Sequence, residues 1–199
     1  MEFKVKKGEF PSFKQWINSV PDLPRKQSTL LIAIDGCGGS GKSTLAKCIS
    51  DKWPGVTIVH MDDFYFPSEQ IIQRPPLQKP IGADVDWLRV LKQVIEPISQ
   101  DRTARYQRYD WDSDKLAEWH DVPIGNIVII EGVYSSRYEL ADYYDFTIWV
   151  DCPRETRLAR GLERDGESAL DIWENNWMIA EDLYVKEHRP QGRADLVVE

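Results

Sequence analysis

The segment Ile34–Thr44, "IDGCGGSGKST", decides the expected fold of this 199-residue chain. It follows the apolar residues Leu30–Ala33, which favour a buried strand, and it leads into a predicted helix. The pattern G-x-x-x-x-G-K-[ST] is met here by Gly36, Gly41, Lys42 and Ser43. Because a phosphate-binding loop requires a strand before it and a helix after it, we interpret the segment as such a loop.

The residue types in this loop indicate how it would hold phosphate. Glycines allow consecutive backbone N–H groups to point inward, and the positive end of the following helix adds to the attraction. We expect Lys42 to reach the β- and γ-oxygens of ATP and the Ser43 hydroxyl to bind Mg²⁺. The residues predicted to bind the nucleotide are Gly36, Cys37, Gly38, Gly39, Ser40, Gly41, Lys42, Ser43 and Thr44.

The rest of the chain alternates between apolar stretches and helical patterns, which predicts an α/β fold. Strands are expected at 29–35, 56–60, 126–132, 145–151 and 194–199, and helices at 42–52, 84–98, 137–143, 153–164 and 169–188. This order predicts the three-layer αβα arrangement of P-loop NTPases with a mostly parallel sheet. Residues 103–123 predict a small edge hairpin, and the proline-rich segment 66–82 predicts an excursion over the surface.

No linker or internal repeat divides the sequence, so we expect a single kinase-like domain over 1–199. Residues 1–28 are expected to form an N-terminal extension with a short amphipathic helix, and about 153–168 to form a helical lid.

The composition restricts the partners and the compartment. A formal net charge of −8 argues against a surface for nucleic acid or an anionic membrane. Three cysteines without a CxxC pair fit neither a disulfide framework nor a zinc site, and no apolar run is long enough to span a bilayer. We therefore expect a cytoplasmic protein whose partners are ATP and a small-molecule acceptor, with a homo-oligomer left open.

Acidic residues follow two predicted strands, at the rim where open α/β sheets bind ligands. In "HMDDFYFP", 60–67, Asp62 is placed to accept the proton of an attacking hydroxyl and to order a Mg²⁺-bound water. Asp63 and Tyr65 are predicted to contact the acceptor; the alternatives are an acidic turn pair and core packing of the tyrosine. Glu131, which ends a strand in "VIIEGVY", is expected to hold the Mg²⁺ water shell; the alternative is a contact with the acceptor.

Arginines recur at spacings of three and four in "RETRLARGLERDG", 154–166, within the predicted lid, which places several on one helical face. Mobile cations stabilise the charge that develops on a transferring phosphoryl group. We expect this role for Arg157, Arg160 and Arg164; the alternative for each is a solvated surface residue.

These residues resemble the uridine kinase and phosphoribulokinase-like group of P-loop kinases, which includes nicotinamide riboside and pantothenate kinases. "GCGGSGKST" is similar to the family's phosphate loop, and "DDFYFP" resembles its "DSFY" and "DDFF" motifs. The resemblance implies that Asp62 is the catalytic base. It also implies acceptor contacts at Asp84 or Asp86 and at Tyr109.

The sequence departs from uridine kinases five residues after that tyrosine, where they carry histidine and this chain has Asp114. A carboxylate cannot donate a hydrogen bond to a pyrimidine carbonyl. With Asp114 at the acceptor site, we expect a cationic or polyhydroxylated acceptor to be preferred to uridine.

Together these features predict an ATP- and Mg²⁺-dependent kinase for a hydroxyl of a nucleoside or related riboside. Two alternatives stay open. One is a kinase for a sugar or a pantothenate-like alcohol, and the other is a nucleotide-binding regulatory module without turnover. The paired aspartates and the arginine-rich segment favour an enzyme, because a sensor needs neither.

Overall fold

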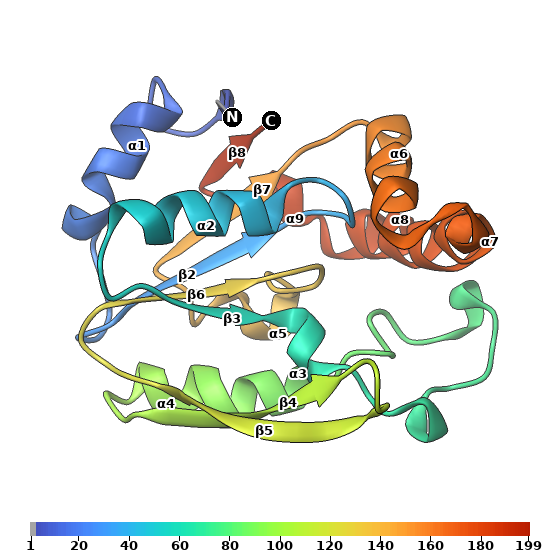
Figure 1. Ribbon diagram of the computed structural model, residues 1–199. Helices are drawn as coiled ribbons and strands as arrows, with labels where there is room; N and C mark the ends of the chain where they lie inside the picture. Colours follow the sequence, from blue (N-terminus) through green and yellow to red (C-terminus); the bar gives the residue numbers. More distant parts are fainter. Residues whose placement is uncertain (1–2) are drawn as a thin grey trace.

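The computed structural model describes residues 3–199 (Figure 1). The strands are β1 (Val5–Lys7), β2 (Leu30–Asp35), β3 (Thr57–His60), β4 (Ala104–Asp110), β5 (Lys115–Val122), β6 (Ile127–Glu131), β7 (Phe146–Val150) and β8 (Leu196–Val198). The α-helices are α1 (Phe13–Ser19), α2 (Lys42–Lys52), α3 (Trp87–Val90), α4 (Glu96–Ser99), α5 (Tyr138–Ala141), α6 (Arg154–Asp165), α7 (Leu170–Ile172), α8 (Met178–His188) and α9 (Pro190–Arg193).

Short 3₁₀ and π turns connect or extend these helices. They are η1 (Val20–Asp22), η2 (Met61–Phe64), η3 (Ser68–Gln70), η4 (Pro76–Gln78), η5 (Leu91–Ile95), η6 (Glu167–Ala169) and η7 (Trp173–Trp177). Since η5 joins α3 to α4, the helix predicted at 84–98 is observed as one stretch with a π turn in its middle.

A six-stranded sheet in the order β1-β8-β7-β2-β6-β3 forms the centre of the molecule. The pairs from β8 to β3 are parallel, and β1 pairs antiparallel with β8. The five predicted strands are confirmed with slightly shorter bounds. Strand β1, which lies in the predicted extension, was missed because two of its three residues are lysines and no apolar pattern marks it.

The sheet carries a separate core on each face, because successive side chains of a strand point to opposite sides. In β2, Leu31 and Ala33 face a core completed by η5 and α4, while Leu30, Ile32 and Ile34 face a core completed by α1 and α2. This arrangement confirms the three-layer α/β architecture and covers both faces of the parallel strands.

The hairpin of β4 and β5 forms a two-stranded sheet of its own instead of an edge of the main sheet. Its inner side chains Tyr106 and Val122 join the core on the η5 face, and Tyr106 stacks on Phe64 of η2 with ring centroids 4.9 Å apart. The alternating sequence pattern predicts the hairpin but not its partner, because alternation reports which face is buried and not which strand lies alongside.

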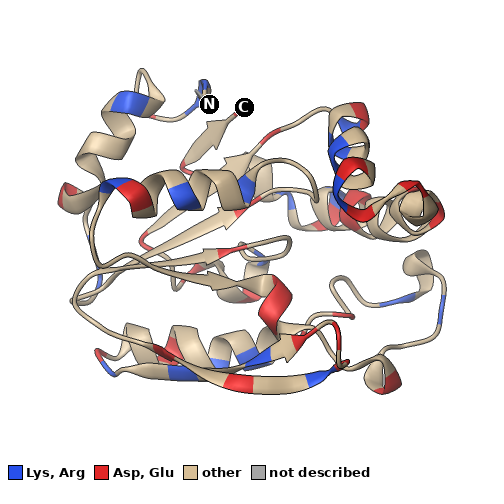
Figure 2. Ribbon diagram, viewed as in Figure 1, with Lys and Arg blue, Asp and Glu red and all other residues tan. Residues whose placement is uncertain are grey.

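The parallel strands β2, β3, β6 and β7 point to the side of the molecule where α6, α7 and α8 stand (Figure 1). Ligands bind at this carboxyl end in open α/β sheets. Figure 2 shows acidic residues on the η2 turn at the end of β3 and basic residues on α6 at the same side. Among residues 3–199 no helix is both long and apolar enough to cross a bilayer.

Candidate active site

The loop between β2 and α2 has the backbone that a phosphate cradle needs. Gly39 has φ +73°, and a Cβ atom there would lie 2.5 Å from the carbonyl oxygen of Arg157, so only glycine fits. Gly41, at φ +106°, caps α2, which begins at Lys42. The first N–H groups of a helix have no partner within it, so the start of α2 offers donors to an anion.

A cavity of about 630 Å³ opens beside this loop, within the size range of small-molecule sites. The loop side is lined by Gly38, Gly39, Gly41, Lys42, Ser43 and Thr44, and the charged side chains around it are Asp62, Glu131, Arg160, Arg164, Asp165 and Glu181. Aromatic side chains also line the cavity: Trp173 lies beside Gly38 of the loop, and Tyr65, Trp111, Tyr134 and Trp177, which we call the aromatic half, come from other segments. The cavity therefore offers both charged groups and aromatic faces to a ligand.

The carboxylate of Glu131 connects the loop to the neighbouring strand. Its Oε1 atom accepts a hydrogen bond from Ser43 Oγ at 3.1 Å and lies 2.5 Å from His60 Nδ1. Burial acts to raise the pKa of Glu131, yet the hydrogen bond with His60 and the charge of Lys42 outweigh it, so that this pKa is lowered. The same hydrogen bond raises the pKa of His60. Glu131 is thus held as a carboxylate next to the Ser43 hydroxyl.

Asp62 lies in η2, directly after β3, and lines the cavity. Its side chain is exposed to the cavity. The surrounding protein atoms nevertheless desolvate the carboxyl and raise its pKa, while the charge of Lys42 acts to lower this pKa. Lys42 is buried and donates to the carbonyl oxygen of Cys37 at 3.0 Å. The two residues carry opposite charges at the same end of the cavity.

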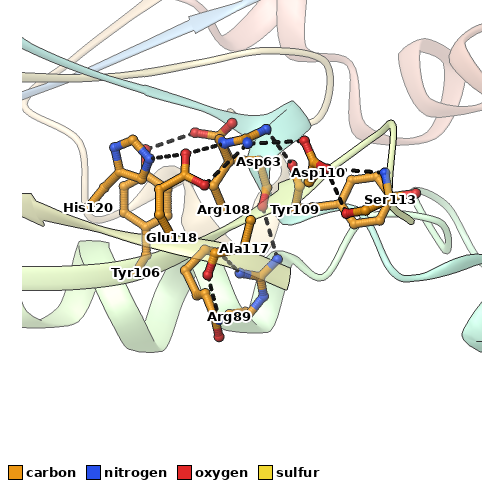
Figure 3. A network of polar contacts seen from close by, with 11 residues as sticks. Asp63, Arg89, Tyr106, Arg108, Tyr109, Asp110, Ser113, Ala117, Glu118 and His120 are labelled. Carbon is orange, nitrogen blue, oxygen red and sulfur yellow. Dashed lines mark hydrogen bonds and ion pairs between the residues drawn. The ribbon is translucent and has the colours of Figure 1, made fainter. Parts of the chain in front are cut away.

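Asp63 points away from the cavity towards the hairpin (Figure 3). Its Oδ2 atom accepts from the Tyr106 hydroxyl at 2.8 Å, and its backbone carbonyl accepts from Arg89. Arg89 also lies over the Phe64 ring, 4.7 Å from its centroid. Asp63 therefore joins η2 to β4 and α3, and the two adjacent aspartates face different surroundings.

The three predicted lid arginines of α6 occupy three different environments. Arg157 is buried and donates to Glu181 Oε2 at 2.9 Å. Arg160 donates to the loop carbonyls of Gly39 and Ser40 and lines the cavity. Arg164, held by Asp165, also lines the cavity, and its charge is felt by Asp62. In this structure Arg160 and Arg164 are the arginines that face the cavity.

The buried pair of Arg157 and Glu181 ties α6 and α8 to the phosphate loop, because Glu181 Oε1 also accepts from the Gly38 N–H at 2.7 Å. Burial raises the pKa of Glu181, while the Gly38 N–H and the charges of Lys42 and Arg157 act to lower it. We expect Arg157→Met to lower the free energy of unfolding by about 3 kcal/mol, since it leaves a buried charge uncompensated.

Urea denaturation measures this change, and Arg154→Met on the same helix is the matched control. Arg154 pairs with Asp182 at the surface, where side-chain exposures are 45% and 59%. Surface pairs contribute below about 1 kcal/mol. Equal effects of the two substitutions would contradict the structural role given to the buried pair.

The other predicted contacts of the acceptor lie near the aromatic half without all reaching it. Tyr65 lines the cavity, and Tyr109 packs against Trp111 with ring centroids 5.1 Å apart. Asp84 pairs with Lys79 at 2.9 Å, and Asp86 caps α3 by accepting from the Arg89 N–H. Roles for these two aspartates in binding remain predictions.

Asp114 accepts hydrogen bonds from the Ser68 N–H at 2.9 Å and from the Tyr109 hydroxyl at 2.7 Å. These bonds fasten the excursion after η2 to the hairpin, and the carboxylate is not part of the cavity lining. The expectation that Asp114 repels a pyrimidine carbonyl needs a direct contact, which this arrangement does not provide.

The sequence analysis missed several side chains at or beside the cavity. Trp177 belongs to a helical stripe that predicts core packing, yet it lines the cavity. His60 appears isolated in the sequence, but strand register places it beside Glu131, so its position as the last residue of β3 was the available signal. Glu181 and Tyr134 reach the cavity only through the packing of α8 and of the turn after β6.

A magnesium ion can be tested against the residues present. Ser43 Oγ and Glu131 Oε1 are adjacent hard oxygen atoms beside the loop, with Asp62 lining the same cavity. Within residues 3–199 no three His, Cys, Asp or Glu side chains form a metal cluster. Mg²⁺ commonly uses one or two protein oxygens together with waters and substrate phosphates, so the donor set fits.

The family profile described as "Phosphoribulokinase / Uridine kinase family" matches residues 80–198, well over half of the chain. The chain belongs to this family. It is therefore a member of a family of P-loop kinases, and nucleotide use follows from that membership. The match begins after the phosphate loop, so the loop and the profile are independent observations.

Individual relatives agree with this assignment. A uridine kinase of Ureaplasma parvum serovar 3 is 21% identical over 185 residues, covering 86% of this chain and 89% of that protein. The solved structure of a possible uridine kinase from Bacillus stearothermophilus superimposes with a TM-score of 0.74 at 22% identity, covering 92% of this chain and 95% of that one. A D-glycerate 3-kinase from Cryptococcus neoformans var. grubii gives a TM-score of 0.54 at 16% identity, with coverages of 89% and 84%. At these identities the structural matches show the fold alone.

Proposed function

We propose that this protein transfers the γ-phosphoryl group of ATP to a hydroxyl of a nucleoside or related riboside, with Mg²⁺. One observation carries the choice of acceptor: a single cavity joins the phosphate loop and Asp62 to an aromatic half. Aromatic faces bind flat π-rings by stacking, whereas a sugar or a small alcohol has no aromatic ring to stack. The aromatic half thus supports a ring-bearing acceptor over the sugar or alcohol alternative.

The proposed chemistry assigns one task to each group of residues. The Asp62 carboxylate accepts the proton of the acceptor hydroxyl as its oxygen attacks the γ-phosphorus, and the bond from phosphorus to the β,γ-bridging oxygen breaks to release ADP. Lys42 and the loop N–H groups hold the β- and γ-oxygens. Arg160 and Arg164 stabilise the charge on the transferring group. Desolvation by the surrounding protein raises the pKa of the Asp62 carboxyl, which favours proton acceptance.

The Ser43 hydroxyl would bind Mg²⁺ directly, and Glu131 would hold one of the waters on the ion. When bound with ATP, the ion supplies positive charge to the β- and γ-oxygens. His60 orients the Glu131 carboxylate through its hydrogen bond.

Replacement of Trp111 tests the acceptor side of the proposal. Trp111 is 53% exposed, lines the cavity and packs on Tyr65 with ring centroids 4.6 Å apart. We expect Trp111→Ala to raise KM for the acceptor by roughly 10-fold, because one stacked face is lost, and to leave KM for ATP unchanged. Steady-state kinetics with each substrate varied in turn measure both constants.

Trp119→Ala on the same hairpin is the matched control. Trp119 is 49% exposed, is not among the residues that line the cavity, and lies under Arg105. Its replacement should leave both KM values unchanged. A loss shared by both variants would point to the hairpin's stability instead of a contact with the acceptor.

A further inference from the structure

Tyr134 differs from the other buried tyrosines in the way its hydroxyl is used. Elsewhere in the described chain, buried tyrosine hydroxyls donate to protein oxygen atoms: Tyr106 to Asp63, Tyr109 to Asp114, Tyr144 to Ser135 and Tyr184 to Asp35. Tyr134 is 8% exposed, and its hydroxyl has no hydrogen-bond partner among residues 3–199. Its oxygen is not among the fully buried side-chain atoms that lack a partner, so it is accessible from the cavity, and its lack of a protein partner requires an explanation.

The position of Tyr134 supplies one. It lines the 630 Å³ cavity and also a smaller recess of about 30 Å³ between residues 76–84 and the helical stretch of η7 and α8. Only Tyr65, Tyr134 and Trp177 line both spaces, so they mark the junction. No residue of the phosphate loop and neither Asp62 nor an α6 arginine lines the recess, so the recess extends from the junction away from these groups.

The backbone fixes this side chain in place. Tyr134 has φ +72°, a left-handed conformation that a bulky residue rarely adopts. Its ring packs edge-on against Tyr184, with centroids 4.9 Å apart, and is confined by Gly82, where a Cβ atom would lie 3.3 Å from the ring. Such backbone strain persists where the surroundings impose it and is concentrated at functional sites.

The nearby carboxylates leave the phenol free to act as a donor. Burial and then the charges of Glu181 and Asp84 raise the pKa of Tyr134, so the hydroxyl keeps its proton. Glu181 is already bonded to Gly38 and Arg157, and Asp84 to Lys79. Neither acid is bonded to the phenol, and a ligand oxygen at the junction would complete its hydrogen bonding.

We propose that Tyr134 is a specificity-determining residue for the acceptor: its hydroxyl donates a hydrogen bond to an oxygen on the acceptor's ring, remote from the phosphorylated hydroxyl. This inference rests on the proposed function. A site built around a donor discriminates against a ligand without the matching oxygen, because the buried donor then stays unpaired.

The test compares Tyr134→Phe with the wild-type protein on inosine, whose ring carries a carbonyl oxygen, and on purine riboside, which lacks it. Phenylalanine keeps the ring packing and breaks no protein hydrogen bond, so the variant should fold. We expect about a 10-fold loss of kcat/KM on inosine through KM, no loss on purine riboside, and unchanged binding of a fluorescent ATP analogue. Tyr138→Phe, an exposed residue outside the cavity, is the control and should change nothing.

Equal losses on both nucleosides, or no loss on inosine, would overturn the inference. If the wild-type protein phosphorylates neither nucleoside, the affinity of each is measured by quenching of tryptophan fluorescence, since Trp111 and Trp177 line the cavity. Absent transfer then contradicts the proposed function for these acceptors, and the inference is judged by the same 10-fold loss in inosine affinity. Failure of the wild-type protein to bind either nucleoside would contradict both.

Discussion

The Lys42→Met variant is expected to fold normally and to lose about 1000-fold in kcat, the upper range for removing one preorganised donor from a developing charge. Lys42 is buried at the start of α2 and, without ligand, donates only to the Cys37 carbonyl oxygen. It is the cation placed to reach the β- and γ-oxygens, and methionine keeps the length of the side chain but not the charge. Single-turnover kinetics with saturating ATP measure the chemical step directly.

The control for this substitution is Lys47→Met on the same helix. Lys47 is exposed and pairs with Asp51 one turn along α2, so its loss should affect neither stability nor turnover appreciably. Near-normal turnover by a folded Lys42→Met protein would exclude the phosphate chemistry assigned to the loop.

The second large effect is expected at Asp62. We expect Asp62→Asn to bind ATP normally and to lose about 100- to 10 000-fold in kcat, the contribution of a positioned general base. The amide occupies the same space but cannot take the acceptor's proton. Binding of a fluorescent ATP analogue and kcat with the best acceptor separate the two properties.

Asp63→Asn is the matched control, because its carboxylate faces Tyr106 and the hairpin and not the cavity. An asparagine oxygen can still accept from the Tyr106 hydroxyl, so kcat should fall far less. If Asp63→Asn proves the more damaging of the two, the base has been assigned to the wrong aspartate.

The central part of this site could be predicted from the sequence because local patterns and strand order determine it. A glycine-rich loop between an apolar strand and a helix has few other uses, and the carboxyl ends of parallel strands meet at one rim. The register of β3 against β6 brings the η2 turn that carries Asp62 close to Glu131, and β2 next to β6 brings Ser43 within hydrogen-bonding distance of Glu131.

The remaining features depend on tertiary packing that periodicity does not report. Helical spacing places Arg157 among the lid arginines, but its partner Glu181 on α8 makes it part of the support of the loop. In the sequence, the position of Asp114 relative to Tyr109 suggests a contact with the acceptor. In the fold, the excursion instead brings the Ser68 N–H to the Asp114 carboxylate. The aromatic half is assembled from the residue after η2, the hairpin turn, the turn after β6 and η7, and no local pattern links these segments.

The most direct test of the central claim is to identify the product formed from ATP and Mg²⁺ with a panel of nucleosides, ribosides, sugars and polyols. Mass spectrometry detects the phosphorylated acceptor, and coupled detection of ADP gives the rate. We predict that ADP release is stimulated by a ring-bearing riboside, that this riboside gains one phosphoryl group, and that Asp62→Asn lowers the rate of both by about 100-fold or more. Phosphorylation confined to sugars or polyols, or ATP binding without any acceptor-dependent ADP release, would contradict the account.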